Sequence, residues 1–136
     1  MSYESNIAQT AHFFAGEDKI LSYEVFASDG TTMENVSAFK MAWTLRKSIV
    51  GQDPHRAQGA AVITKSTEGS GPGITITGVH NATRATNSQR VIVTILDTDT
   101  EALAGGRYVC SLKRIDAGLE AVLSHGVVEV LVAAVR

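Results

Sequence analysis

The chain has 136 residues, which is enough for a single domain with one sizeable core. Apolar residues make up 44% and charged residues 19% of the chain, a composition typical of globular proteins and unlike that of disordered ones. The formal net charge is −2 and no run of Lys or Arg exceeds two residues, which argues against a nucleic-acid partner. The single cysteine, Cys110, excludes an intrachain disulfide and lies in an apolar strand pattern typical of a buried side chain.

Almost every periodic stretch of the sequence alternates apolar and polar residues with period two, the pattern of half-buried strands. In chain order these stretches cover residues 19–28, 39–47, 60–65, 74–79, 90–96, 108–115, 119–123 and 127–135. Turn signals such as Asp29-Gly30 separate them, and no amphipathic helix of ordinary length interrupts them. The pattern predicts an all-β antiparallel sandwich of eight or nine strands over residues 10–136, preceded by a polar N-terminal arm over residues 1–9.

The apolar face of the clearest strands is predicted to point into the core of this sandwich. The residues on that face are Met41, Trp43, Leu45, Val91, Val93, Ile95, Tyr108, Cys110, Leu112, Val128 and Val130. Near the C-terminus, Ser124-His125-Gly126 is typical of a break or bulge between two strand patterns.

A glycine-rich run, GSGPG at residues 69–73, lies between two of the strand patterns. A phosphate-binding loop would need a helix N-terminus after the glycines, whereas the β-branched segment ITIT follows here. The run therefore predicts a hairpin turn, with residues 74–79 returning beside residues 60–65.

Carboxylates alternate in the segment DTDTE, where Asp97, Asp99 and Glu101 form a weak candidate for a cation site. The central glycine and distal glutamate of a calcium loop are missing, so a solvated acidic turn is the alternative. No histidine stands at zinc-ligand spacing from another His or Cys, and no serine lies in a nucleophile elbow. The sequence thus predicts no catalytic residue, no cofactor and no enzyme activity.

The segment TEALAGGRY follows directly, over residues 100–108. A short helical turn over residues 100–103 is predicted to stop at the two glycines, because Gly106 can adopt the positive φ of a chain reversal. Leu103 would then point inward, and the Tyr108 hydroxyl would turn back to the preceding crossover, as in a tyrosine corner. Such a corner joins the two sheets of a sandwich and carries no chemistry.

The order of several short motifs adds a resemblance to a known family. The motifs are Phe14-Ala-Gly16-Glu17-Asp18 followed by Val25, Asp29-Gly30, Asn35-Val-Ser37-Ala38, Phe39 to Leu45, Asp99 to Tyr108, Asp116-Ala-Gly118 and Gly126 to Val130. Their order resembles that of the immunoglobulin-like domain that opens phage baseplate upper proteins and recurs in small virion proteins of tailed phages. The resemblance covers roughly residues 10–132 and implies a non-enzymatic virion protein. Such a protein would be made in the host bacterial cytoplasm and bind other capsid, neck or tail subunits in many copies.

Two classes of function remain open at this point. Baseplate upper proteins continue into trimerising helices, whereas this chain stops at Arg136, which favours a capsid decoration (cement) protein over a neck, tail or baseplate component. A host-surface carbohydrate-binding module is the alternative of another class. An aromatic content of 6% and the lack of aromatic residues at 48–58 and 80–89 argue against it. A membrane partner is not expected, because the longest apolar run is interrupted by Glu129.

Overall fold

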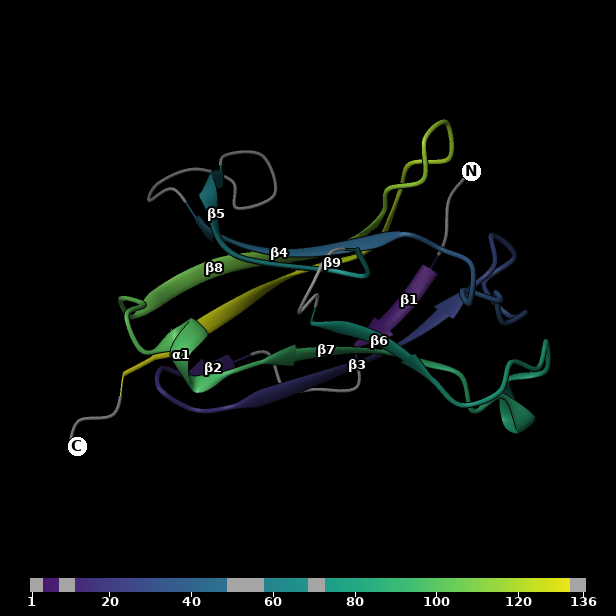
Figure 1. Cartoon of the computed structure of the whole chain (residues 1–136), viewed down its shortest axis with the longest axis horizontal. Helices are drawn as coiled ribbons and strands as arrows, with labels where there is room; N and C mark the ends of the chain where they lie inside the picture. Colours follow the sequence, from purple (N-terminus) through teal and green to yellow (C-terminus); the bar gives the residue numbers. More distant parts are fainter. Residues whose placement is uncertain (1–3, 8–11, 49–57, 69–72, 133–136) are drawn as a thin grey trace.

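The computed structural model describes residues 4–7, 12–48, 58–68 and 73–132. Its strands are β1 (Glu4–Ile7), β2 (His12–Phe14), β3 (Lys19–Phe26), β4 (Met41–Ser48), β5 (Gln58–Ser66), β6 (Ile74–Thr77), β7 (Arg90–Ile95), β8 (Gly106–Arg114) and β9 (Ala121–Leu131). A 3-10 turn, η1 (Arg84–Thr86), and one helical turn, α1 (Asp97–Thr100), complete the described elements. The strands form two sheets that face each other, which confirms the predicted all-β sandwich (Figure 1).

The strand order within the sheets is that of an immunoglobulin-like domain. One sheet has the order β1-β3-β7-β6 and corresponds to strands A, B, E and D of the immunoglobulin fold. The other has the order β2-β9-β8-β4-β5, in which β9, β8 and β4 correspond to G, F and C, and β5 adds the further edge strand C′. The first strand of the fold is divided, with β1 in one sheet and β2 in the other.

The N-terminal segment departs from the predicted arrangement in two ways. Residues 4–7, which belong to the predicted arm, form β1 and pair antiparallel with β3 from Glu4↔Phe26 to Ile7↔Tyr23. Strand β2 pairs parallel with β9, so the sandwich is not purely antiparallel. Segments of three or four residues are too short to display an alternating pattern, which is why the sequence did not indicate them.

The predicted hairpin around residues 69–73 is wrong. Strand β5 pairs with β4, whereas β6 pairs with β7 in the opposite sheet, so the chain crosses from one sheet to the other at this point. Residues 69–72 lie outside the described residues, and Gly73 has a φ of +83°, which favours glycine. The glycines signal a reversal of the chain without specifying the strand that receives β6, and Ile74 is buried in the core.

The two predicted strands nearest the C-terminus are one continuous strand, β9, as far as Leu131. A bulge does occur, but it falls earlier than the predicted Ser124-His125-Gly126. The register of β8 and β9 shifts where Leu112 opposes Ser124 and Lys113 opposes Val122. The extra residue between them, Leu123, is buried, so the bulge turns an apolar side chain into the core.

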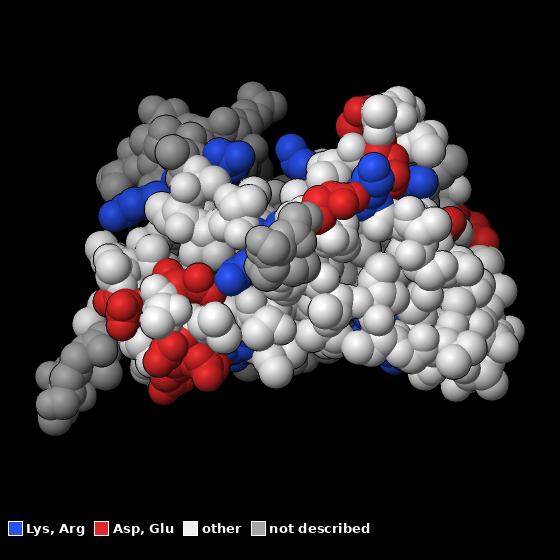
Figure 2. Space-filling view, viewed as in Figure 1, with Lys and Arg blue, Asp and Glu red and all other residues white. Residues whose placement is uncertain are grey.

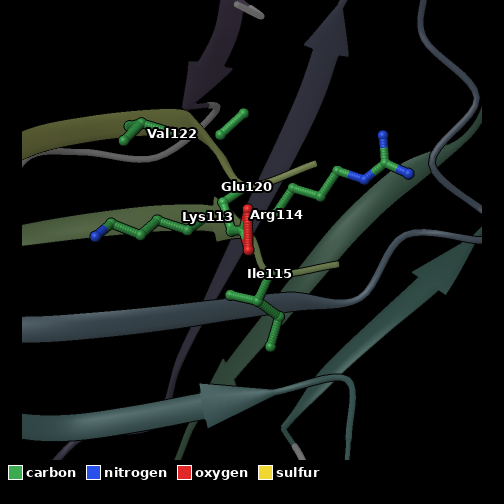
Figure 3. A pocket seen from close by; sticks show the side chains of 6 residues that line it. Lys113, Arg114, Ile115, Glu120 and Val122 are labelled. Carbon is green, nitrogen blue, oxygen red and sulfur yellow. The ribbon is translucent and has the colours of Figure 1, made fainter. Parts of the chain in front are cut away.

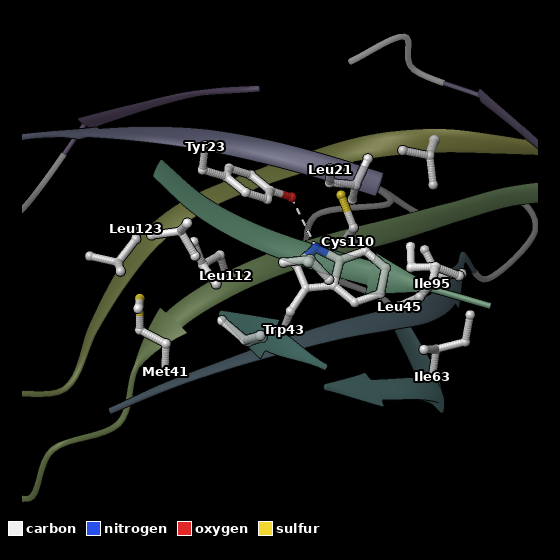
Figure 4. Packing of buried hydrophobic residues seen from close by; sticks show 14 of the residues in the cluster. Leu21, Tyr23, Met41, Trp43, Leu45, Ile63, Ile95, Cys110, Leu112 and Leu123 are labelled. Atoms are coloured by element: carbon white, nitrogen blue, oxygen red, sulfur yellow. Dashed lines mark hydrogen bonds between the residues drawn. The ribbon is translucent and has the colours of Figure 1, made fainter. Parts of the chain in front are cut away.

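All eleven residues predicted to point inward are buried. At the centre of the core, Trp43 is completely buried and its indole Nε1 donates a hydrogen bond of 3.0 Å to the Tyr23 hydroxyl (Figure 4). The same hydroxyl hydrogen-bonds the Cys110 thiol, and burial raises the pKa of both groups above their ordinary values. Tyr23 on β3 and Cys110 on β8 thus link the two strands that a disulfide joins in antibody domains, with Trp43 beside them.

Candidate functional site

The weak candidate for a cation site, Asp97, Asp99 and Glu101, is not grouped as a set of metal ligands in the structure. Within the described residues, no three His, Cys, Asp or Glu side chains are grouped so as to hold a metal ion. The Asp99 carboxylate instead accepts hydrogen bonds from Lys65 Nζ at 2.7 Å and from the Leu96 amide at 2.8 Å. Burial opposes its ionisation, but these bonds outweigh burial and lower the pKa of Asp99. Its charge is thus matched by a lysine, and Asp99 holds β5 against α1.

The acidic turn is itself part of the fold at the α1 end of the sandwich. The Asp97 amide donates a hydrogen bond of 2.6 Å to Asp18, which lies in the turn between β2 and β3. Thr100 is completely buried and accepts a hydrogen bond of 2.9 Å from the Gly16 amide of the same turn. Glu101 is the C-cap of α1, so the helical turn lies at residues 97–100 and not at the predicted 100–103. The helical turn therefore begins three residues earlier than predicted, and its first and last residues, Asp97 and Thr100, are bonded to the turn before β3.

Directly after α1, the chain adopts the geometry of a tyrosine corner. The Tyr108 hydroxyl donates a hydrogen bond of 2.8 Å to the Ala104 carbonyl, four residues upstream, and the Tyr108 ring is buried. Gly106 has a φ of +142°, within the range that favours glycine, and Leu103 is half-buried against the core. Burial raises the pKa of Tyr108, which keeps the hydroxyl protonated as a donor. Leu103, Gly106 and Tyr108 therefore lie together and stabilise the crossover between α1 and β8.

The other end of the sandwich is formed by three connections, residues 27–40, 78–89 and 115–120, which we call the loop end (Figure 1). The first two are bonded to each other. The Met33 amide donates to the Ala82 carbonyl at 3.0 Å, and the Val36 amide donates to Gln89 Oε1 at 3.1 Å. Gln89 is buried, so its side chain is fixed where it joins the two loops.

The third connection, the β8–β9 hairpin, is fixed to the first by side chains at its base. The Arg114 guanidinium lies 3.8 Å from the centre of the Phe39 ring and donates a hydrogen bond of 2.7 Å to Asp116. Asp116 also accepts the Lys40 amide at 3.1 Å, and the hydrogen bond from Arg114 is the main reason that its pKa is lowered. The Ile115 amide donates to the Lys40 carbonyl at 2.7 Å. The hairpin is therefore held in place by bonds to both backbone and side chains.

A pocket of about 410 Å³ lies beside this hairpin (Figure 3). It is lined by Lys113, Arg114, Ile115, Glu120, Ala121 and Val122. Large apolar side chains around it face solvent: Ile115 is 40%, Leu119 is 50% and Val122 is 49% exposed. Within the described part of the chain Lys113 has no ion-pair partner. The lining holds no pair of nucleophile and base, so the arrangement suits docking of an apolar group beside an anion and offers no covalent chemistry.

A second group of exposed apolar side chains lies at the α1 end, on Phe14, Ile20, Leu96 and Val132. In the register of β3 and β7, Ile20 opposes Thr94, which places Ile20 and Leu96 on the same outer face of their sheet. Figure 2 shows Asp and Glu side chains gathered at this end of the molecule. The α1 end therefore carries exposed apolar side chains from both sheets, with carboxylates nearby.

The sequence did not indicate either apolar surface. Ile115 and Leu119 flank the tight turn at Gly118, where they resemble the ends of ordinary strand patterns. One feature of the sequence could have indicated the exposed side chain of Val122. Val122 and Leu123 are consecutive apolar residues, and a half-buried strand accommodates such a pair only at a bulge or with one of the two side chains exposed.

Exposed aromatic platforms, the usual feature of a sugar-binding site, are scarce in the described part of the chain. Trp43 lies in the core, and Phe14 is 41% exposed. No helix formed by the described residues has the length and apolar character needed to span a bilayer.

Comparisons with known proteins give no family. No protein-family model matches the chain, and no curated protein matches it. Among solved structures, the chain is similar to part of chitinase ChiW from Paenibacillus sp. str. FPU-7, a multi-modular enzyme expressed at the bacterial cell surface. The two are 14% identical, with a TM-score of 0.46 over 95% of this chain. The chain spans 8% of the length of that protein.

Proposed function

We propose that this protein is a non-enzymatic structural component of a phage particle, and specifically a capsid decoration (cement) protein that binds assembled head subunits. The observation that carries a docking role is the loop end. There a hairpin fixed by Arg114, Asp116 and Phe39 presents three exposed apolar side chains and a pocket that the exposed Lys113 helps to line. The phage setting comes from the order of the sequence motifs.

A rigid hairpin of this kind suits recognition of a protein surface. The Arg114 and Asp116 side chains at its base are paired with each other, so docking need not leave either of these two charges without a partner. A partner surface that covers the exposed apolar side chains around the pocket removes them from water, which favours association. A small contact of this size is expected to be weak in isolation. On a symmetric shell, many equivalent contacts act together through their high effective concentration.

The test compares phage particles with and without the protein. Particles that lack it are expected to assemble but to lose resistance to heat or to low salt, and adding the purified protein should restore that resistance. Particles treated with the Leu119→Ser variant should remain sensitive, whereas the Val62→Ser variant is the matched control, because Val62 is exposed on β5, away from the loop end.

A different result would replace the decoration role with a neck, tail or baseplate position. In that case particles without the protein would keep stable heads and fail only to adsorb to the host or to complete their tails.

A further inference from the structure

We draw no further inference here: the strongest candidate, the group of exposed apolar side chains that includes Ile20 and Leu96 on the outer face of their sheet at the α1 end, carries nothing because nothing in the structure shows what covers it.

Discussion

At the scale of single residues, two buried tyrosine rings differ in what their hydroxyls satisfy. Tyr23 accepts the indole N–H of Trp43, which has no access to water. Tyr23→Phe should therefore leave a buried donor unpaired and lower the free energy of unfolding by about 1–3 kcal/mol. Denaturant titration of the variant and the parent measures the difference, and equal midpoints would show that the indole finds another acceptor.

Tyr108→Phe is expected to cost less, about 1 kcal/mol. The Tyr108 hydroxyl donates to the carbonyl of Ala104, and Ala104 is exposed, so water can replace the lost donor. The same titration should rank the parent above Tyr108→Phe and Tyr108→Phe above Tyr23→Phe. The reverse order of the two variants would mean that the corner, and not the core bond, is the more important link between the sheets.

Substitutions at two glycines with the same φ distinguish the cost of backbone strain from the cost of steric overlap. Gly78 and Gly118 both have a φ of +79°. A Cβ at Gly118 would meet no atom within 4 Å, so Gly118→Ala should cost about 1–2 kcal/mol from the left-handed backbone alone. A Cβ at Gly78 would lie 2.1 Å from the Ser88 carbonyl oxygen, so Gly78→Ala should cost clearly more. Thermal unfolding of both variants checks this, and similar midpoints would contradict it.

At the scale of elements, the ion pair between β5 and α1 makes part of the stability depend on pH. The pKa of Asp99 is lower in the folded protein than in the unfolded chain, so the unfolded chain binds a proton first as pH falls. The stabilisation is complete above about pH 4–5, where an unfolded aspartate is ionised, and is lost as pH falls through the folded value.

Unfolding midpoints measured between pH 2 and 7 should therefore decline at the acid end. The decline should be shallower in Asp99→Asn and in Lys65→Met, because each removes one partner of the 2.7 Å pair. The pKa of Asp116 is also lowered, mainly by its hydrogen bond from Arg114. The part of the acid dependence that comes from Asp116 should therefore remain in both variants. An unchanged slope in both variants would show that the β5–α1 pair does not contribute.

The elements also show how far the sequence determines the fold. Long strands such as β4 and β7 follow from alternation, because a residue such as Trp43 can be buried only on one face. The short strands β1 and β2 could not be predicted, since three or four residues show no period. The partner of β6 could not be predicted either, because glycines mark a reversal without specifying the sheet that receives the next strand.

The same limit applies to the candidate site. The tyrosine corner depends on residues close together in the sequence, so its spacing is visible there. The loop end depends on contacts such as Phe39 with Arg114 and Val36 with Gln89, which join residues more than fifty positions apart. Pattern within a short window carries no information about such pairs.

At the scale of the whole molecule, Cys110 reports on separation of the two sheets. Its side chain is 1% exposed, and burial raises the pKa of its thiol, so neither access nor ionisation favours reaction with a thiol reagent. Labelling in the native state should therefore require global unfolding. The free energy of opening obtained from labelling rates should equal the free energy of unfolding from denaturant titration. Labelling in buffer at the rate of a free thiol would contradict the described core.

The parallel pairing of β2 with β9 also has a mechanical consequence. His12↔Glu129 to Phe14↔Leu131 run side by side in the same direction, one near each end of the described chain. Opposed tension on the two ends would pull these strands past each other along their length. The hydrogen bonds between them would then be loaded together in shear, rather than opened one after another as in an unzipping hairpin. Strands loaded in shear resist separation better than strands that open one hydrogen bond at a time, so the two ends of this domain are joined by the pairing that best withstands tension.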